Sequence, residues 1–508
     1  MSVRDAQATV DRNDAGPRSN WRANLLVGAV CGLTTFVWLA LANRQIITSP
    51  VLEDGDFAAN SILVDRAESF RLLIGNYSRV GFNHPGPALL YAQAFGDIIV
   101  HRTLGIAPSS YGGQFAGILA LNSVCVGIAG GVIRAVSGRW LAAAALLAVL
   151  PLINVWEPYA LATTWMPGVY IAPFLLMVVS AAAVAGAHWE NLWVLVAAAS
   201  LCVHGHVSFV MFAGATVVLA GLAGWLRVRR GNAGPTKGQL IAAAGVLVLF
   251  LLPIVANLVL HWPGEMARYL QFLGSDAGFS PRTAGDVAGF VGSFWVRGGL
   301  WLVVFFALSV ALAVIARIAD PRDTAARFRL DVVAFCVVET ALFTYYAARG
   351  VDNLEFDYVG WFMLSCPLLV LWAGLDSVLD VLTRQVERAG QAIGTALCAL
   401  LATVFLLVGT SANPYRGMPA ALVAALPDGD VRLSFQTAGW PSGLGLLEQA
   451  RRAGHLACVE GAAWAILVTP ALVCTDASPG RSVLVLGPDE PRPDDVRYDD
   501  GRTALVVD

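Results

Sequence analysis

The sequence predicts an all-α membrane protein of many spans that ends in a small α/β module. Of its 508 residues, 57% are hydrophobic and 14% are charged, whereas soluble domains carry about 25% charged residues. The mean hydropathy of +0.65 agrees with this class. After about residue 412 the long apolar runs give way to short alternating segments, which are typical of strands and turns in a water-exposed unit.

The region 21–411 is expected to form the transmembrane domain, with about eleven spans of which one is short, because a crossing helix needs about 20 apolar residues. The spans are residues 22–42, 112–134, 139–155, 167–187, 191–204, 207–226, 238–260, 292–316, 330–348, 358–379 and 391–411. A polar tail, residues 1–20, precedes them. Ala40-Leu-Ala42 resembles a signal-peptidase site, but with so many spans following we expect an uncleaved anchor.

The short basic loops decide the orientation, because cytoplasmic loops carry an excess of Lys and Arg. With a cytoplasmic N-terminal tail, all of these loops fall on the inner side. Their basic residues are Arg134, Arg139, Arg227, Arg229, Arg230, Lys237, Arg317, Arg322, Arg327, Arg329, Arg384 and Arg388. The outer side then holds segments 43–111, 156–166, 261–291 and 349–357 and the module 412–508. We therefore expect a multi-pass protein of the cell membrane with an extracytoplasmic C-terminal module.

The module is expected to contain three short strands, Val431–Phe435, Ala465–Val468 and Ser482–Leu486, and a helix over Gly443–Ala453. Its two cysteines, Cys458 and Cys474, are either a disulfide, which an outside compartment permits, or two buried thiols. The acidic end is interpreted as a solvated tail. Its residues include Asp494, Asp495, Asp499 and Asp500.

Composition also limits the partners. The net charge of -3 and the lack of a Lys/Arg-rich tract give no indication of nucleic-acid binding. Six of the eight cysteines lie in apolar runs, where cysteine acts as a small hydrophobe. No Cys or His grouping has metal-site spacing. We expect no metal and no cofactor.

The first outer loop carries an acidic motif, Glu53-Asp-Gly-Asp56, about ten residues after the first span. Asp54 and Asp56 project close together around a glycine, and one of them is positioned to take a proton from an attacking hydroxyl. The alternative is a solvated turn, since Asp-Gly favours turns. Further along, Pro87 to Leu104 is apolar but contains charged residues, which suits a helix in the membrane interface.

The segment Asn83-His-Pro-Gly-Pro87 is a stiff turn, because its two prolines fix φ. His84 held this way orients a substrate hydroxyl or phosphate, or it caps a helix. The loop arginines Arg66, Arg71 and Arg79 suit phosphate, or else the headgroups of anionic lipids.

Other outer polar residues are further candidates for substrate contact. His204-Gly-His206 lacks a third metal ligand, so it is interpreted as a substrate-facing turn or as rings in the headgroup layer. Glu157 and the stretch 349–358 combine acids with aromatics, which suits sugar binding or the aromatic belt of a membrane protein. Glu339 is predicted near mid-membrane, where a carboxylate is a functional candidate or is protonated and bonded to a neighbouring helix.

Together these features resemble the GT-C superfamily of membrane glycosyltransferases, which have many spans, a long first outer loop and an acidic motif after the first span. The loop often carries a His-Pro element, here His84-Pro85. A nearer resemblance is to actinobacterial membrane proteins with a Tyr-Ser-Arg-x-Gly-x-x-His-Pro-Gly-Pro segment, here Tyr77 to Pro87. The layout matches over residues 20–411 and the motifs over residues 51–91.

The resemblance implies an inverting transfer of a sugar from a polyprenyl-phosphate donor to a cell-envelope glycan, glycolipid or glycoprotein. It places the catalytic base at Asp56 or Asp54, with Asp56 favoured. The motif is Asp-Gly-Asp, whereas some branches have adjacent acids, so the choice of acid stays open. Arg349, Arg297 and Arg79 are the candidates for the donor phosphate. The expected substrate-binding residues are Tyr77, Arg79, Asn83, His84, Glu157, His204, His206 and Arg349.

Two other functions are compatible with the sequence. A transporter or flippase of a lipid-linked envelope precursor would use mid-membrane polar groups, and Glu339 is the main residue of that kind. An envelope scaffold would bind a partner through the C-terminal module.

Overall fold

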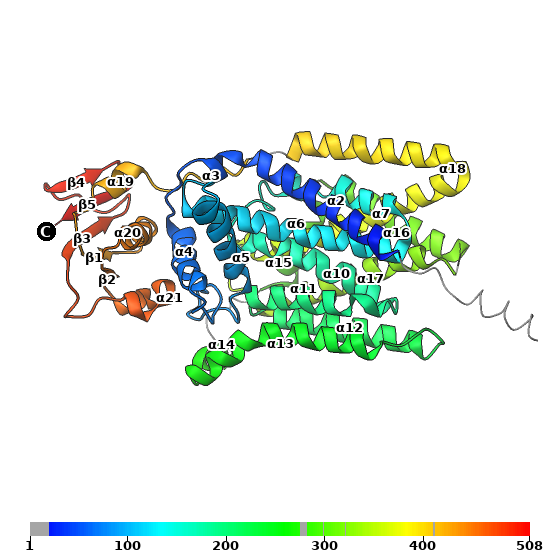
Figure 1. The fold of residues 1–508 in the computed structure, drawn as a ribbon, viewed down its shortest axis with the longest axis horizontal. Coiled ribbons are helices and arrows are strands. Elements are labelled where there is room, and N and C mark those ends of the chain that lie inside the picture. The colour runs from blue at the N-terminus through cyan, green and yellow to red at the C-terminus, as the bar shows by residue number, and fades with distance from the viewer. Residues whose placement is uncertain (1–19, 275–281, 298, 321, 410–411, 508) are drawn as a thin grey trace, which may run out of the picture.

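The computed structural model describes residues 20–274, 282–297, 299–320, 322–409 and 412–507. It shows a bundle of long helices with the C-terminal module at one end (Figure 1). The predicted N-terminal tail lies outside the described residues except for Asn20. The protein is thus a helical membrane protein with a small α/β module, as the composition predicts.

Within the described residues, eight helical segments are long and apolar enough to cross a membrane. Five are single helices: α2 (Trp21–Ala42), α6 (Ser110–Ser137), α12 (Phe209–Val228), α13 (Lys237–Leu260) and α17 (Thr324–Arg349). The others lie in α9 (Met166–Val169) with α10 (Ile171–Ala185), in α16 (Trp301–Ala319), and in η3 (Asp357–Leu364) with the first part of α18 (Ser365–Gly409).

The remaining predicted spans are helical but shorter than this criterion. Residues 139–155 form α7 (Trp140–Val149) and α8 (Leu152–Trp156), which Pro151 separates because it lacks a backbone donor. Residues 191–204 correspond to α11 (Leu192–Gly205), which follows the one-turn η2 (Trp189–Asn191). The sequence predicts about eleven spans, one of them short, and eight of the described segments have the full length for a crossing.

Two predicted span boundaries differ from the structure. The predicted span 292–316 is divided between α15 (Ala284–Val296) and α16. Spans 358–379 and 391–411 belong largely to α18, which changes direction (Figure 1). At that bend a Cβ added to Gly390 would lie 2.3 Å from the carbonyl oxygen of Leu382, so glycine permits the reversal.

The first outer loop is largely helical. It contains α3 (Arg44–Thr48), α4 (Gly55–Glu68), α5 (Ala88–Gly96) and the π-helix η1 (Asp97–Thr103). The predicted helix from Pro87 to Leu104 is therefore confirmed. Within this region α5 packs closely against α6, since a Cβ on Gly117 would lie 2.3 Å from the oxygen of Ala92. That this helix lies in the membrane interface stays a prediction.

Glycines also bring the first span close to α6. A Cβ on Gly28 would lie 2.9 Å from the oxygen of Gly127, and one on Gly32 would lie 3.0 Å from that of Ser123. Small residues four apart let membrane helices approach at backbone distance. The packing fixes α2, and with it the start of the outer loop.

Buried ion pairs join the helices near the predicted inner side. Arg329 is fully buried and pairs with Asp376 at 2.8 Å and with Asp380 at 3.0 Å. Arg139 reaches the same two carboxylates at 2.6 and 3.0 Å. Because each buried charge has a partner, these residues of the basic loops fix α17 and the α6–α7 turn to α18.

The module contains a five-stranded sheet in the order β2-β1-β3-β5-β4. The strands β1 (Val431–Phe435), β2 (Ala457–Val459) and β3 (Arg481–Leu486) are parallel, whereas β4 (Val496–Asp499) and β5 (Ala504–Val507) pair antiparallel. The helix α20 (Trp440–Arg452) packs on the sheet. The short helix α19 (Ala420–Ala424) comes before β1 in the chain. This confirms the two predicted strands now labelled β1 and β3, and the predicted helix.

Two predictions for the module are wrong. Ala465–Val468 is a helix, α21, between the one-turn helices η4 (Ala462–Trp464) and η5 (Pro470–Leu472). Four apolar residues suit a buried helical turn as well as a strand. The acidic end is not a mere solvated tail, because β4 and β5 form a hairpin on the sheet.

Cys458 and Cys474 form a disulfide, which decides between the disulfide and the two buried thiols that the sequence left open.

The module is joined to the first outer loop along two adjacent chain segments. Leu52 bridges to Gly417, and the Met418 amide donates to the Leu52 oxygen at 2.8 Å. At the membrane end of these segments, the Asn413 amide donates to Asn43 Oδ1 at 2.8 Å. The outer loop and the module therefore form one structural unit.

This unit has its own core. Ala58, Ala59 and Ile62 of α4 share a hydrophobic cluster with residues of α20 and the sheet. At its edge the fully buried Glu53 accepts two hydrogen bonds from Arg452 of α20, at 2.9 and 3.0 Å. Burial of apolar surface and a paired charge together hold the module on α4.

Candidate active site

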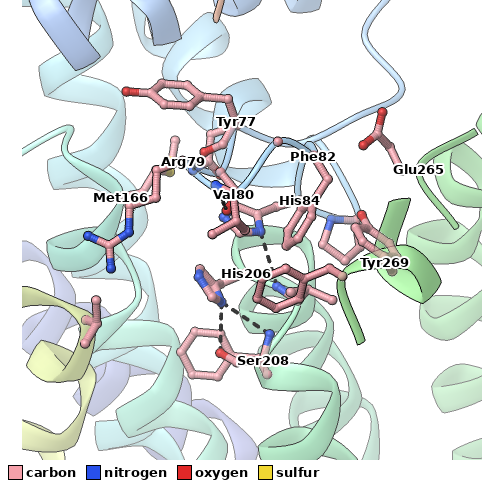
Figure 2. Close-up of a pocket in the computed structure, with 18 of the residues that line it drawn as sticks. Tyr77, Arg79, Val80, Phe82, His84, Met166, His206, Ser208, Glu265 and Tyr269 are labelled. Carbon is pink, nitrogen blue, oxygen red and sulfur yellow. Dashed lines mark hydrogen bonds between the residues drawn. The ribbon is translucent and has the colours of Figure 1, made fainter. Parts of the chain in front are cut away.

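A cavity of about 1370 Å³ lies where the predicted first outer loop, the adjacent ends of the spanning helices and the module meet. Further walls come from α14 (Gly264–Gly274) in the outer segment before α15. The walls are mainly apolar, with a few acids, histidines and arginines. Figure 2 shows Tyr77, Arg79 and His84 of the first loop on the pocket wall, with His84 directly beside His206.

Asp56 lines this cavity from the first turn of α4. Its Oδ2 accepts a hydrogen bond from Trp165 Nε1 at 2.9 Å, and its Oδ1 accepts one from the Tyr77 hydroxyl. Burial and the nearby Asp56 charge raise the pKa of Tyr77, so this phenol remains a donor. Two fixed donors orient the carboxylate while it faces the cavity.

Asp54 faces a different environment. It is the residue before α4, and its Oδ1 accepts a hydrogen bond from the Tyr415 hydroxyl at 2.8 Å. The same hydroxyl accepts from the Asp54 amide at 2.9 Å. Burial raises the pKa of the Asp54 carboxyl. Asp54 is not among the residues that line the cavity, so the two acids of the motif are separated by Gly55, whose φ of +51° suits glycine.

His84 and His206 form a pair on the cavity wall, with ring centroids 4.1 Å apart. Val207 N donates to His84 Nδ1 at 3.4 Å, and Ser208 N donates to His206 Nδ1 at 3.2 Å. Each Nδ1 is therefore an acceptor, which leaves each Nε2 to carry the proton. Burial lowers the pKa of His206 to about 4 and that of His84 well below its usual value. The pair is neutral and offers N–H donors.

Two arginines line the cavity. Arg79 pairs with Asp352, donates to the Tyr358 hydroxyl at 2.8 Å and lies over the Phe356 ring at 4.5 Å. Arg349 is the last residue of α17, and its guanidinium has no hydrogen bond or ion pair with any residue that the structure describes. Arg349 is thus the cavity arginine whose charge is not neutralised by those residues.

Comparison with solved structures identifies the fold. ArnT from Cupriavidus metallidurans, solved bound to undecaprenyl phosphate, matches with a TM-score of 0.59 and 15% sequence identity, over 97% of this chain and 98% of that chain. The chain has the fold of this ArnT structure. The Archaeoglobus fulgidus oligosaccharyltransferase in the apo form matches with a TM-score of 0.37 and 13% identity, over 92% of this chain and 69% of that one. No protein-family model and no curated protein matches the sequence.

Three expected substrate-binding residues are not among the residues that line the cavity. Asn83 is buried and donates through Nδ2 to the Gly75 oxygen at 3.3 Å. His204 donates through Nε2 to the Phe250 oxygen at 2.8 Å and accepts at Nδ1 from Ala88 N at 3.3 Å. These two side chains hold the loop and the helices together, because Asn83 Nδ2 and both ring nitrogens of His204 are already bonded.

Glu157 is the third expected substrate-binding residue that does not line the cavity. It pairs with Arg297 at 2.7 Å. Arg297 also pairs with Asp357. Burial raises the pKa of Glu157, and the Arg297 charge opposes that rise. Two carboxylates therefore neutralise Arg297, which removes it as the preferred candidate for a phosphate contact.

Several cavity residues were missed at the sequence level. Trp165 holds Asp56, Trp440 and Trp464 reach the cavity from the module, and Glu265 and Tyr269 reach it from α14. Glu265 accepts from the Asn83 amide at 2.7 Å, and Tyr269 donates to the Asn83 oxygen at 2.6 Å. The only available signal was the aromatic content of the outer segments, which also fits a membrane belt.

Glu339 lies in α17, away from the residues of this cavity. It is fully buried and accepts a hydrogen bond from Thr216 of α12. The bond to a neighbouring helix agrees with the structural interpretation of this carboxyl. Among the described residues, no group of three or more His, Cys, Asp and Glu is arranged to hold a metal ion.

Proposed function

We propose that the chain is a membrane glycosyltransferase that moves a sugar, with inversion, from a polyprenyl-phosphate donor to a cell-envelope acceptor at the outer face of the cell membrane. The observation that carries the proposal is one continuous cavity. It places Asp56 and Arg349 on its walls and extends between the outer ends of the spanning helices. A carboxylate and a cation in one apolar cavity suit proton removal and stabilisation of a leaving phosphate.

The membrane side of the cavity suits an isoprenoid chain. Its walls include Val203 of α11, Phe209 of α12 and Leu258 of α13. Side chains of this kind stabilise an apolar chain. The polar groups, by contrast, come mainly from the outer loops. The undecaprenyl phosphate bound in the ArnT structure supports a donor of this class, because the two chains share the fold over nearly their whole length.

The phosphate of the donor is assigned to Arg349 and the histidine pair. A guanidinium binds phosphate through several N–H donors, and Arg349 has none of its donors used by described residues. His84 and His206 add neutral N–H donors on the wall of the same cavity. Arg79 is already bonded to Asp352 and Tyr358, so it is assigned a positioning role.

The reaction follows from these positions. Asp56 accepts the proton of an acceptor hydroxyl as the hydroxyl oxygen bonds to the anomeric carbon. The bond from that carbon to the phosphate oxygen breaks, and polyprenyl phosphate leaves with its charge held by Arg349. Attack from the side opposite the phosphate inverts the anomeric configuration. The leaving group already carries its phosphate, so the step requires no metal.

A comparison of Asp56→Asn with Asp54→Asn tests the proposal. Membranes containing each variant are given radiolabelled polyprenyl-phosphate mannose or arabinofuranose, at equal protein level. We expect Asp56→Asn to lose about 10²–10⁴-fold in transfer rate, the usual contribution of a general base, and Asp54→Asn to retain most of it. A normal rate in Asp56→Asn would refute the assignment of the base.

Donor binding is tested separately. Native mass spectrometry of the purified full chain with undecaprenyl phosphate should show a complex that Arg349→Ala weakens. An equal affinity in the wild type and Arg349→Ala would remove Arg349 from the phosphate site. A wild type without a complex would contradict a polyprenyl-phosphate donor.

A further inference from the structure

The C-terminal module supplies part of the cavity wall. Its contribution comes from α20 with the residue Thr437 before it, and from the loop 459–473 with η4 and α21. The aromatic members are Trp440 and Trp464. In Figure 1, α20 and α21 both lie beside α4, the helix that carries Asp56.

Trp440 lies next to the catalytic motif. A Cβ added to Gly55 would lie 3.6 Å from the indole carbon Cη2 of Trp440. Gly55 precedes Asp56, so the indole lies against the backbone of the proposed base. Tyr77, which donates to Asp56, packs against the same module cluster as Trp440 and Trp464. The module side of the cavity is therefore an aromatic surface around one carboxylate.

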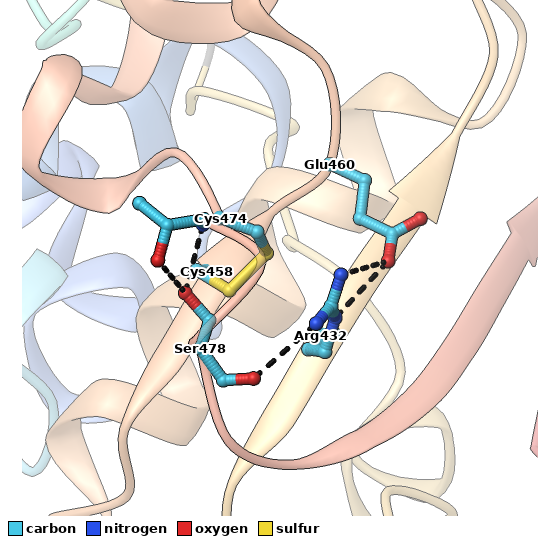
Figure 3. The surroundings of a disulfide bond; sticks show 6 residues. Arg432, Cys458, Glu460, Cys474 and Ser478 are labelled. Atoms are coloured by element: carbon cyan, nitrogen blue, oxygen red, sulfur yellow. Dashed lines mark hydrogen bonds and ion pairs between the residues drawn. A yellow bond between two sulfur atoms is a disulfide. The ribbon is translucent and has the colours of Figure 1, made fainter.

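Trp464 is held in place by its surroundings. Its ring packs on Phe435 of β1 with centroids 4.8 Å apart, and it stays partly exposed on the cavity wall. The loop that carries it is closed at its base by the Cys458–Cys474 disulfide (Figure 3). There the Cys474 amide also donates to the Val459 oxygen at 2.9 Å.

A second contact fixes the start of this loop. Glu460 pairs with Arg432 of β1 at 3.1 Å, and Arg432 also donates to the Ser478 oxygen at 3.3 Å (Figure 3). The loop 459–473 thus has both ends attached to the sheet. Its cavity residues are positioned as one rigid wall.

The chemistry of this wall indicates its ligand. Inversion requires the acceptor to approach opposite the donor phosphate, and hence on the Asp56 side. The isoprenoid chain is excluded there, because the module lies at the end of the molecule away from the spanning helices (Figure 1). Indole faces beside a carboxylate bind a ring that is apolar on its face and carries hydroxyls at its edge.

We propose that Trp440 and Trp464 hold a sugar ring of the acceptor beside Asp56, and that the Cys458–Cys474 disulfide positions this wall. The acceptor is accordingly a glycan or the glycan part of a glycolipid. The inference rests on the proposed function, because it takes Asp56 as the base. It adds the acceptor class and two specificity residues.

The test measures sugar binding by the full chain in lipid nanodiscs. Saturation-transfer NMR is recorded with soluble oligosaccharides of mannose, arabinose, galactose and N-acetylglucosamine. We expect at least one of them to bind, and Trp464→Ala and Trp440→Ala each to weaken it by about fivefold, the effect of losing one aromatic contact. Trp464→Phe should retain binding. Trp193→Ala, a change at an exposed tryptophan of α11, is the matched control.

The disulfide is tested with Cys458→Ser/Cys474→Ser in the same assay, where weaker sugar binding with unchanged undecaprenyl phosphate binding is expected. Binding of none of the oligosaccharides to the wild type would overturn the inference, as would equal binding by both alanine variants. These outcomes are separable from failure of the proposed function. In that case undecaprenyl phosphate would not bind, or Asp56→Asn would transfer sugar normally.

Discussion

At the residue scale, the structure gives two neighbouring acids different environments. Asp56 has donors from Tyr77 and Trp165 and faces the cavity, whereas Asp54 is bonded to Tyr415. The sequence placed both acids around a glycine but offered no means of choosing, because their partners lie far along the chain. Spacing predicts which residues come close together. It does not predict which way each side chain turns.

Removal of the Tyr77 hydroxyl tests whether the orientation of Asp56 matters. Tyr77→Phe should lower kcat by about tenfold or more, because a hydrogen bond to a charged group contributes about 1.5–3 kcal/mol. Tyr415→Phe removes the matching bond to Asp54 and should leave kcat nearly unchanged. Sugar transfer by both variants is compared at equal protein level, and equal losses would show that the two bonds act only on folding.

The histidine pair predicts a pH dependence of stability. Burial lowers the pKa of His206 from 6.5 to about 4 in the folded protein, so the unfolded state binds the proton more readily. The free energy of unfolding should therefore fall as the pH drops from 6.5 towards 4, and this contribution is complete above pH 6.5.

Thermal unfolding of the wild type and His206→Gln between pH 7 and pH 4 measures this contribution of His206 to the free energy of unfolding. The variant should lose less stability over this range, whereas His261→Gln, a change at an exposed histidine, should follow the wild type. Parallel curves for wild type and His206→Gln would contradict the prediction.

The eight predicted substrate-binding residues divide into five that line the cavity and three that do not. Tyr77, Arg79, His84, His206 and Arg349 line the cavity as expected. Asn83, His204 and Glu157 were selected for the same residue types, but the fold uses them in its own hydrogen bonds and ion pairs. A sequence pattern does not contain that distinction, since the partners come from other helices. The resemblance to actinobacterial proteins with the Tyr77–Pro87 segment stays a prediction.

At the element scale, two hydrogen bonds join α14 to Asn83 of the first loop: Glu265 accepts from the Asn83 backbone N–H, and Tyr269 donates to the Asn83 carbonyl oxygen. Tyr269→Phe removes one of them and should speed amide hydrogen exchange in residues 264–274 by about fivefold, since one such bond contributes about 1 kcal/mol. Tyr345→Phe changes another cavity tyrosine, one without a hydrogen bond to a described residue, and should have no effect. Unchanged exchange in Tyr269→Phe would show that packing alone holds α14.

Long elements were more predictable than short ones. Helices such as α6 and α13 follow from 20 or more apolar residues, and β1 and β3 follow from alternation. The four residues of α21 are too few for a period to be recognised. The strand β4 has a register shift and no fully buried residue, so its pattern does not stand out from a polar tail.

At the scale of the whole molecule, the ion pair between Glu53 and Arg452 joins the outer loop to the module. Arg452→Ala leaves the fully buried Glu53 carboxylate without its main partner and should lower the free energy of unfolding by about 3–5 kcal/mol. Arg481→Ala, a change at an exposed arginine of β3, is the control. Thermal unfolding is measured for both, and equal midpoints would show that the ion pair adds no stability.

The orientation of the chain stays a prediction from its basic loops. A cysteine placed at Asp489 in the module should react with a membrane-impermeant maleimide in intact cells, and one at Asn232 between α12 and α13 should react only after lysis. Background labelling should be low, because the six free cysteines are buried and the other two form the disulfide. The reverse pattern of labelling would invert the topology.

The two adjacent segments that join the loop to the module have a consequence for chimaeras. Leu52 and Gly417 bridge, Asn43 and Asn413 are bonded, and α4 completes the module core. A graft that exchanged residues 412–508 alone would place a foreign core against the native α4 and disturb the backbone beside Asp56. A transplant of residues 43–68 together with 412–508 would preserve both surfaces. The unit of exchange between related enzymes is therefore discontinuous in sequence, and its boundaries lie at the membrane ends of the two segments.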